Sequence, residues 1–482
     1  MTLANPAPDS RPHIVLVIAR GEAIRNFVFS DTLRVLSQQA RVTLLSMVEH
    51  GEVIAQAQPY AERILPLRAY PPRPLIPLFH DVINTAHYRW MWTEAAKYYW
   101  GKHNKRVQGN WREAFKLFWV RFFSTFFLNR PMLELGTAID RWLQWNLRPT
   151  RELDALFTEL QPDLVFNCSH IHGPLADFPL RVAHGLGYKT AAFLFSWDNL
   201  TSRGRIMVPY DHFLVWTESI KQKLLEIYPN TAPGRVTVTG TPQFDFHFDS
   251  RFELSREELC ARVGLDAARP FILYTTGMNP DFAEEHRTVR FVIDFLQTLP
   301  TVERPQLLVR TYIKGNSPEM LALGEEMRGH PDVVFPPILL DKQWIIPLHE
   351  DLYIYSNLLR HCVMGINGAS TVTLELMMMG KPVVNLAFEP PGSALPHYMR
   401  FARHIDYEHY RPVAASGDAM VARSLDDLKA MILCGLAHPE ADRPAQQRFL
   451  QAFFGPTLDG KSGQRVAEEL LRLARESREK PT

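Results

Sequence analysis

The chain has 482 residues, of which 46% are hydrophobic and 22% charged, a composition typical of a globular protein. This length is too great for one ordinary hydrophobic core, so we expect two domains. Because 53 Lys or Arg residues stand against 52 Asp or Glu, the formal net charge is +1, and no overall positive field indicates a nucleic-acid partner.

The cysteines and the N-terminus bear on the compartment. Four cysteines occur far apart, mostly in apolar surroundings and without a CxxC pair, so we expect buried thiols in a reducing compartment: Cys168, Cys260, Cys362 and Cys434. MTLANPAPDSRPH has no basic segment followed by an apolar run, and nowhere do eighteen apolar residues occur without a charge. We therefore expect a cytoplasmic protein with no membrane span.

The first predicted elements form a strand-helix-strand unit. HIVLVIAR, residues 13 to 20, is a continuous apolar run that ends in a turn at Gly21. A helical period covers residues 26 to 38, and VTLLSM, residues 42 to 47, indicates a second buried strand. This spacing predicts a parallel sheet.

Residues 71 to 150 interrupt that pattern and predict a helical insertion. After the turn YPPRPLIP, aromatic and basic residues alternate along a long helical stretch. Apolar rings combined with cations are typical of helices that lie on an anionic membrane surface, so we expect a peripheral membrane contact through residues 79 to 130, at the inner face of the membrane. The alternatives are a helical core packed on the first sheet, or an oligomer contact. The aromatic residues concerned are Trp90, Trp92, Tyr98, Trp100, Trp111, Phe115, Phe118, Trp119, Phe122, Phe123 and Phe126.

The α/β alternation then resumes and is followed by a second series. The first domain, which we extend to residue 245, has four further candidate strands: PDLVFNCS, KTAAFLFS, HFLVWT and RVTVTGT. The linker is placed in QFDFHFDSRFELSREELC, which has no clean period. A second domain, residues 246 to 460, has its own candidate strands: FILYTTG, QLLVRTY, DVVFPP, HCVMGIN and PVVNLAF. A C-terminal segment, residues 461 to 482, contains an amphipathic helix over 463 to 479, which we expect to pack on the first domain.

The most informative segment is GINGASTVTLELMMMGKPVVNL, residues 365 to 386. Ligands of doubly wound sheets bind beyond the carboxyl ends of the strands, and here a small-residue turn joins a strand to a helix. Backbone N–H groups of such a turn, with the helix N-terminus, can hold a diphosphate. The alternative is that Ser370 or Thr371 only caps the helix. The residues of this turn are Gly368, Ala369, Ser370 and Thr371.

Ser-Thr-x-x-x-Glu at the start of a helix that ends in Gly-Lys-Pro-Val resembles the donor motif of GT-B glycosyltransferases. The resemblance implies that Ser370 and Thr371 contact the diphosphate of a nucleotide sugar and that Glu375 accepts hydrogen bonds from its ribose. The alternative for Glu375 is a solvated helix carboxylate. The implied fold is α/β, with two Rossmann-like domains that face each other across a cleft and with the aromatic-rich helical insertion in the first.

A second resemblance lies in VWTESIKQKLLEIYPNTAPGRVTVTGTPQFD, residues 215 to 245. It is similar to the segment before the interdomain linker in the UDP-N-acetylglucosamine 2-epimerase and CDP-glycerol glycerophosphotransferase relatives of this fold. The matching positions are Thr217, Glu218, Gly240 and Pro242. Both resemblances together cover most of residues 155 to 390, whereas the insertion matches no family. The hydrolysing epimerases carry a His-Arg-Arg-Glu-Asn run where this chain has TTGMNPDFAEEHR, a difference that counts against epimerase chemistry.

Candidate bases follow the strands of the first domain. Asp198, in the loop FSWDNLTSRGR, is placed to accept a proton from an acceptor hydroxyl, and the alternative is an Asx-turn. Glu22 in ARGEAIRN is the competing base. His170 and His172 are candidates for a base or an acceptor contact, and the alternative is that they are packed loop histidines. We do not expect a metal site, because the sequence offers no third ligand nearby. Further residues expected at the cleft are Arg20, Arg25, Asn26, Arg203 and Arg205.

In the second domain, Thr275, Thr276 and Gly277 form a predicted phosphate-facing turn, and Arg310 ends a strand where a cation can neutralise a leaving diphosphate. No DxD-like metal site follows a strand. We therefore expect a glycosyltransferase without metal or cofactor, which uses a nucleotide-diphosphate sugar as co-substrate and a glycan or lipid-linked acceptor in surface polysaccharide or glycolipid assembly. The alternatives are a CDP-glycerol-type polyol-phosphate transferase and a non-catalytic scaffold of the same fold.

Overall fold

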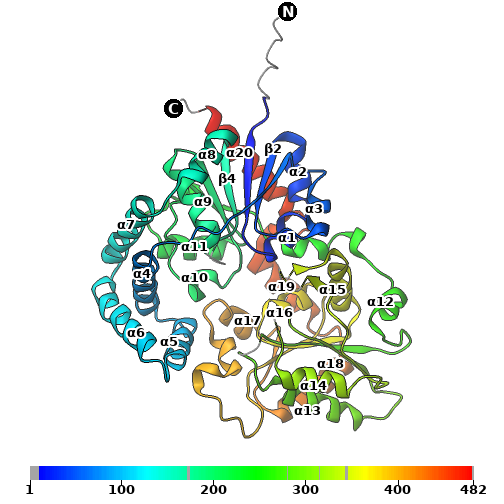
Figure 1. The fold of residues 1–482 in the computed structure, drawn as a ribbon. Helices are drawn as coiled ribbons and strands as arrows, with labels where there is room; N and C mark the ends of the chain where they lie inside the picture. Colours follow the sequence, from blue (N-terminus) through cyan, green and yellow to red (C-terminus); the bar gives the residue numbers. More distant parts are fainter. Residues whose placement is uncertain are drawn as a thin grey trace, which may run out of the picture.

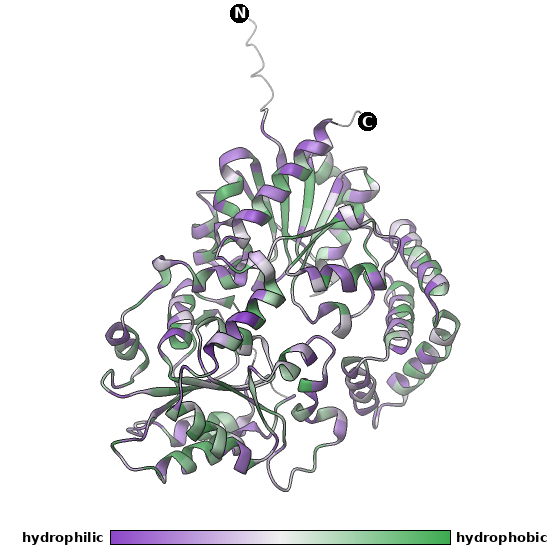
Figure 2. Ribbon diagram, turned by 180° about the vertical axis from the view of Figure 1, so that it is seen from behind, coloured by the Kyte–Doolittle hydropathy of each residue, from purple (hydrophilic) through white to green (hydrophobic). Residues whose placement is uncertain are grey.

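The computed structural model describes residues 10–170, 174–278, 281–313, 315–341, 343 and 346–479. Over these residues, a seven-stranded and a six-stranded parallel sheet form two α/β domains, with helices on both faces of each sheet (Figure 1). Seen from behind, hydrophobic residues are concentrated in the strands of the first sheet, and the covering helices carry hydrophilic residues outward (Figure 2). The predicted fold class is confirmed.

The first sheet has the order β3-β2-β1-β4-β5-β6-β7. Its strands are short apolar runs, and all six residues of β1 are buried. The order reverses between β1 and β4, so the loops after these strands flank the crevice where such sheets bind ligands. In chain order the strands are β1 (His13–Ile18), β2 (Arg41–Ser46), β3 (Arg63–Pro66), β4 (Leu164–His170), β5 (Lys189–Leu194), β6 (His212–Val215) and β7 (Val236–Val238).

The helix predicted over residues 26 to 38 is two helices, so that prediction was wrong in its boundaries. Ser30 adopts an extended conformation, and its side chain accepts a hydrogen bond from the Thr32 N–H, which begins a new helix. The helices on this sheet are α1 (Glu22–Phe27), α2 (Asp31–Gln39), α3 (Gly51–Ala57), α8 (Arg151–Leu160), α9 (Pro174–Gly185), α10 (Asn199–Ser202) and α11 (Glu218–Ile227).

The insertion is helical, as predicted, and forms a curved layer beside the first sheet, at the left of Figure 1. Its helices are α4 (Leu75–Met91), α5 (Glu94–Arg106), α6 (Trp111–Ser124) and α7 (Arg130–Leu147). Helix α4 packs on α6 and α7 through a small core that includes Ile83, Val120 and Leu133. Helix α5 also contacts the second domain at residues His397–Met399.

The second sheet has the order β10-β9-β8-β13-β14-β15. Its strands are β8 (Phe271–Thr275), β9 (Gln306–Arg310), β10 (Val333–Val334), β13 (Met364–Gly368), β14 (Val383–Leu386) and β15 (Met420–Ala422), and a separate hairpin pairs β11 (Leu340–Asp341) with β12 (Ile346–Pro347). The helices are α12 (Arg256–Val263), α13 (Glu285–Gln297), α14 (Pro318–Glu326), α15 (His349–His361), α16 (Thr371–Met378), α17 (Arg411–Ser416), α18 (Leu425–Ala437) and α19 (Arg443–Phe454).

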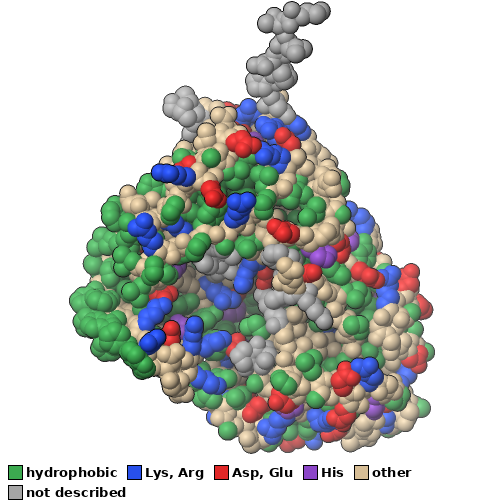
Figure 3. All heavy atoms as spheres, in the orientation of Figure 1, with side chains coloured by type: hydrophobic (Ala, Val, Ile, Leu, Met, Phe, Trp, Pro, Cys, Tyr) green, Lys and Arg blue, Asp and Glu red, His purple; other side chains and the backbone are tan. Residues whose placement is uncertain are grey.

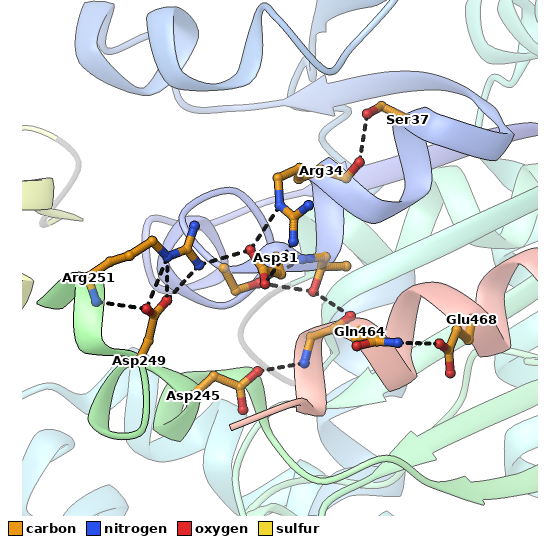
Figure 4. A network of polar contacts seen from close by, with 11 residues as sticks. Asp31, Arg34, Ser37, Asp245, Asp249, Arg251, Gln464 and Glu468 are labelled. Atoms are coloured by element: carbon orange, nitrogen blue, oxygen red, sulfur yellow. Dashed lines mark hydrogen bonds and ion pairs between the residues drawn. The ribbon is translucent and has the colours of Figure 1, made fainter. Parts of the chain in front are cut away.

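The C-terminal helix α20 (Ser462–Glu479) packs on α2 and on strands of the first sheet, as the sequence predicted. Asp245, at the end of the first domain, accepts hydrogen bonds from the N–H groups of Ser462 (3.1 Å) and Gly463 (2.7 Å) at the start of this helix (Figure 4). Nearby, Arg251 of the linker bonds to Asp31 of α2 at 3.2 Å. These contacts tie the linker and the returning helix to the first domain.

Three cysteines are buried as expected, but Cys434 is exposed, which corrects that part of the prediction. Cys434 lies on α18, whose buried side is formed by Leu428 and Ile432. In the described part of the chain, no helix combines the length and the apolar character that a membrane span requires.

Candidate functional site

The site lies between the two domains, where the molecule is hollowed and Lys and Arg side chains gather (Figure 3). One direct contact joins the candidate turn of the second domain to the candidate loop of the first. The indole Nε1 of Trp197 donates a hydrogen bond to Thr371 Oγ1 at 3.1 Å. Trp197 directly precedes Asp198, so the predicted donor turn and the predicted base meet in the structure.

The turn from Gly368 to Thr371 leads from β13 into α16. Ser370 stands at the N-cap position, but its side chain makes no cap hydrogen bond and instead donates to Asn367 Oδ1 at 3.2 Å. The alternative that Ser370 only caps the helix is therefore wrong. Gly368 is required for packing, because a Cβ at this position would lie 2.5 Å from the Phe282 ring. Ala369 is half-buried beside it.

Glu375, one turn into α16, is only 5% exposed, so the alternative of a solvated carboxylate is wrong. Its two oxygens accept hydrogen bonds from His247 Nε2 (3.0 Å) and from the Tyr355 hydroxyl (2.6 Å). Burial, with the neighbouring Glu375 carboxylate, raises the pKa of Tyr355 well above its ordinary value. The carboxylate is thus held in one orientation by a linker residue and by α15.

Arg310 ends β9 and is buried near the same cluster. Its Nη2 donates to Asp351 Oδ2 at 2.6 Å, and its guanidinium lies 5.0 Å from the centre of the Tyr355 ring. The other terminal nitrogen, Nη1, is buried and has no hydrogen-bond partner among the described residues. A cation with one unused pair of donors next to the donor turn can stabilise the oxygens of a diphosphate.

The predicted phosphate-facing turn after β8 is only partly open to a ligand. The Gly277 N–H donates to Glu285 Oε2 at 2.8 Å, and the Phe282 ring covers Gly277, so the expectation that Gly277 faces a phosphate was wrong. Burial raises the pKa of Glu285 to about 8. Thr276 Oγ1 accepts from the Tyr312 N–H at 2.9 Å, and Thr275, the last residue of β8, is buried.

Asp198 stands at the start of α10 in the loop after β5. Its side chain makes no cap bond, so the Asx-turn alternative is not observed, and it accepts a hydrogen bond from the Ser202 hydroxyl. Burial by itself would raise the pKa of Asp198, but His409 and Arg203 hold it below its ordinary value. Asp198 is therefore an ionised carboxylate at neutral pH and can accept a proton.

Arg203, from the same loop, donates from Nη1 to the Tyr99 hydroxyl of the insertion at 2.9 Å. Its neighbour in the loop, Arg205, faces the insertion instead. Arg205 is buried and bonds Thr137 Oγ1 at 2.7 Å and Glu134 Oε1 at 2.5 Å. The expectation that Arg205 lies at the cleft was therefore wrong.

The loop after β1 carries the competing base. Glu22 is half-buried at the start of α1, and Arg20, before it, is exposed. Arg25 donates from Nη2 to Gln243 Oε1 at 2.8 Å and from Nε to Asn26 Oδ1 at 3.1 Å, whereas Asn26 is fully buried. Arg25 and Asn26 thus connect the loop to the linker, and Glu22 stays a second candidate.

His170 is the last residue of β4 and is buried, with Nδ1 2.8 Å from the Tyr210 hydroxyl. His172 lies outside the described residues. In the ranges that the structure describes, no group of three or more His, Cys, Asp or Glu side chains is arranged to hold a metal ion.

Several residues of the cluster were not predicted. His247, Tyr355 and Trp197 lie in segments far apart in the sequence and meet only in the folded chain. Trp197 offered one signal, since a large aromatic residue stood among turn formers in a loop after a strand.

The insertion presents an apolar surface that we call the aromatic face. It consists of side chains on and next to α6 that are between 38% and 73% exposed: Trp111, Phe115, Phe118, Trp119, Phe122, Phe123 and Phe126. Hydrophobic side chains gather at this edge of the molecule in Figure 3. The alternative that these rings fill a helical core is therefore wrong, although Tyr98 of α5 is buried.

No protein-family model matches the chain, and no curated protein matches its sequence. Solved structures match over nearly the whole length. A UDP-N-acetylglucosamine 2-epimerase has 14% identity and a TM-score of 0.53, with 98% of both chains covered. UDP-GlcNAc 2-epimerase from Neisseria meningitidis bound to UDP-GlcNAc has 12% identity and a TM-score of 0.53, with 95% of this chain and 100% of that chain covered. A glycosyltransferase from Rickettsia africae has 10% identity and a TM-score of 0.51, with 96% and 99% covered.

At these identities the likeness establishes the fold. The chain has the GT-B fold, with two Rossmann-like domains that face each other across a cleft.

Proposed function

We propose that the protein is a nucleotide-sugar-dependent glycosyltransferase, whose second domain holds the donor and whose first domain presents the acceptor hydroxyl. The observation that carries this proposal is the contact of the Asp198 loop with the donor turn, through Trp197 and Thr371 at 3.1 Å. This contact brings an ionised carboxylate of one domain next to the diphosphate-binding candidate of the other. Two solved structures of the same fold contain bound UDP-GlcNAc, which is consistent with a nucleotide-sugar donor.

In the proposed reaction, the acceptor hydroxyl oxygen forms a bond to the anomeric carbon of the sugar while the bond from that carbon to the diphosphate oxygen breaks. Asp198 accepts the hydroxyl proton. The diphosphate leaves with the bonding electrons, and Arg310 and the N-terminus of α16 stabilise its charge. Glu375, fixed by His247 and Tyr355, accepts hydrogen bonds from the ribose.

We favour transfer over epimerisation because the His-Arg-Arg-Glu-Asn run of the hydrolysing epimerases is absent here. In its place, Gly277 is bonded to the buried Glu285 and covered by Phe282.

We also propose that the enzyme works at the cytoplasmic surface of an anionic membrane, on a glycan or lipid-linked acceptor. The aromatic face supplies the apolar contact. Residues 79 to 130 contain nine Lys or Arg against three Asp or Glu, an excess that the rest of the chain does not share. Exposed rings combined with a local positive charge match the interface of an anionic bilayer.

Vesicle binding tests this membrane contact. We expect the protein to sediment with phosphatidylglycerol vesicles and less with phosphatidylcholine vesicles. Phe122→Ser should weaken binding by about tenfold, since burying a Phe side chain is worth roughly 1.5–3 kcal/mol. Phe248→Ser is the matched control, because Phe122 and Phe248 are both 45% exposed and Phe248 lies outside the insertion. Equal binding of the two variants, or a stable dimer that Phe122→Ser dissolves, would refute the membrane contact.

The transfer reaction is tested by nucleotide release from UDP-, GDP-, dTDP- and CMP-sugars in the presence of membrane extract as the source of acceptor. We expect release of a nucleoside diphosphate from one donor, coupled to labelled product. Release of CMP from CDP-glycerol would instead identify a polyol-phosphate transferase. Nucleotide binding without release from any donor would favour a scaffold, and conversion of UDP-GlcNAc to its 2-epimer would refute the proposal.

A further inference from the structure

A second cavity, of about 710 Å³, lies within the first domain, between the carboxyl end of its sheet and the insertion. Helices α4, α7 and α9 form its walls together with the loop that carries Tyr70 and with the end of β4 at His170. Its volume is in the range of small-molecule sites, roughly 300–1,000 Å³. The roles proposed above for the nucleotide sugar use none of its walls.

Arg148, on this wall at the end of α7, is the most informative residue. It is 8% exposed and bonds only to neutral groups, with Nη1 3.2 Å from Gln144 Oε1 and Nη2 on the Tyr70 carbonyl oxygen. Its guanidinium carbon lies 3.6 Å from the centre of the Phe178 ring. Among the described residues, no carboxylate lies within ion-pair distance of Arg148, and its Nε has no partner.

The other cations of the wall have ion-pair partners. Arg181 pairs with Asp140 at 2.9 Å, and Arg205 with Glu134 at 2.5 Å. Asp81 bonds Lys116 at 2.9 Å. Asp177 lies 3.6 Å from His170 Nδ1, and its Oδ1 has no hydrogen-bond partner among the described residues. Arg148 is thus the arginine of this wall without an ion pair in the described structure, and the Asp177 charge acts on it only from beyond ion-pair distance.

A buried cation without a counter-ion is costly to the fold unless something compensates its charge. Burial and the neighbouring Arg181 lower the pKa of Arg148 to about 10 against the opposing effect of the Asp177 charge, and Arg148 stays charged at neutral pH. An anion that enters the cavity would supply the missing partner and would be bound by charge-assisted hydrogen bonds. His170 Nε2 and Arg181 Nη1 are further polar atoms on this wall that have no partner among the described residues.

We propose that this cavity binds the anionic group of the acceptor, a phosphate or carboxylate attached to a sugar, with Arg148 as the residue that recognises it. This inference rests on the proposed function, because the first domain is the one that presents the acceptor. The Asp177 carboxylate and His170 provide groups for the sugar hydroxyls, and Tyr70 with the prolines after it forms an apolar wall. Helix α7 carries Arg148 into the cavity while its Trp142 and Trp145 are exposed, which suits an acceptor held at a lipid surface.

Calorimetric titration of the full chain tests the inference without any donor. The probes are glucose 6-phosphate, glucuronate, a short-chain isoprenyl phosphate and, as the neutral control, glucose. We expect an anionic probe to bind and glucose not to bind. Preference for glucose 6-phosphate would identify a sugar phosphate, and preference for glucuronate would identify a sugar acid. Preference for the isoprenyl phosphate over both sugars would place the anion on a lipid and overturn its assignment to a sugar.

Arg148→Gln should weaken binding of the anionic probe at least tenfold, because it removes the charge but keeps a hydrogen-bonding side chain. Arg141→Gln is the matched control, since Arg141 lies two turns earlier on α7 and bonds the Met207 carbonyl oxygen at 2.8 Å outside the cavity. Equal affinity of the two variants, or no binding of any anion, would overturn the inference.

UDP binding by Arg148→Gln distinguishes the two proposals. Retained UDP binding with lost anion binding supports the acceptor site on an intact enzyme. Wild-type protein that binds UDP but no anionic probe would reject the acceptor site alone, whereas failure to bind any nucleotide would reject the proposed function.

Discussion

Asp198→Asn is the substitution that separates chemistry from binding. The two side chains have the same shape, and an Asn oxygen can still accept the hydrogen bond from Ser202. Loss of a general base lowers the rate by roughly a hundredfold to ten-thousandfold, or about 3–5 kcal/mol in the barrier. The donor is held by the other domain, so KM for the donor and nucleotide affinity should change little. Initial rates of nucleotide release, with calorimetry for the nucleotide alone, measure both quantities.

The pH dependence gives an independent check on the same residue. His409 and Arg203 keep the pKa of Asp198 below its ordinary value, so its carboxylate is lost only in strong acid. The rate should therefore show no fall from this group between about pH 8 and pH 5, whereas a histidine base would give a limb near its ordinary pKa of about 6.5. If Asp198→Asn keeps its rate within tenfold while Glu22→Gln loses a hundredfold, Glu22 is the base and our assignment is refuted.

Two further predictions concern stability. Burial raises the pKa of Asp245 to about 6, so its protonated form favours the folded state, and this contribution of about 3 kcal/mol is lost as pH rises from about 4 to about 7. In urea unfolding, the free energy of unfolding of wild type should fall relative to that of Asp245→Asn as the pH rises over this range. A difference between the two that does not change with pH would contradict the raised pKa of Asp245. Gly240→Ala should cost more than Gly187→Ala, because both glycines have positive φ but only at Gly240 would a Cβ meet another atom, Ser462 Oγ at 2.5 Å. Each strained alanine costs about 1–2 kcal/mol from its backbone alone, and equal unfolding free energies of the two variants would refute the packing argument.

The fold was accessible from the sequence because it depends on local patterns. β1, β2 and β8 are continuous apolar runs, and each lies close to its predicted residues. Helix α12 shows what local reading missed, because the capping box of Ser255 and Glu258 marks a helix inside the segment that we assigned to the linker. The break between α1 and α2 depends on one side-chain bond at Ser30, which periodicity does not detect.

The site was accessible only in outline. Strand-end position brought Arg310, Thr371 and Asp198 to the cleft, since parallel strands end at one edge of a sheet. The partners that orient these groups come from distant segments. His247 reaches Glu375 across 128 residues, and Trp197 reaches Thr371 across 174. Such pairings depend on how the domains pack, and neither periodicity nor spacing encodes them.

Calorimetric titration with UDP, GDP and dTDP tests the central claim, that the second domain binds a nucleoside diphosphate beside Arg310. We expect at least one of the three to bind the wild-type chain, and Arg310→Lys to weaken it at least tenfold, because Lys keeps the charge but loses the second donor pair of the guanidinium. Arg287→Lys, on the exposed side of α13, is the control and should bind as wild type does. Absence of binding by all three nucleotides, or equal affinity of Arg310→Lys and wild type, would contradict the account.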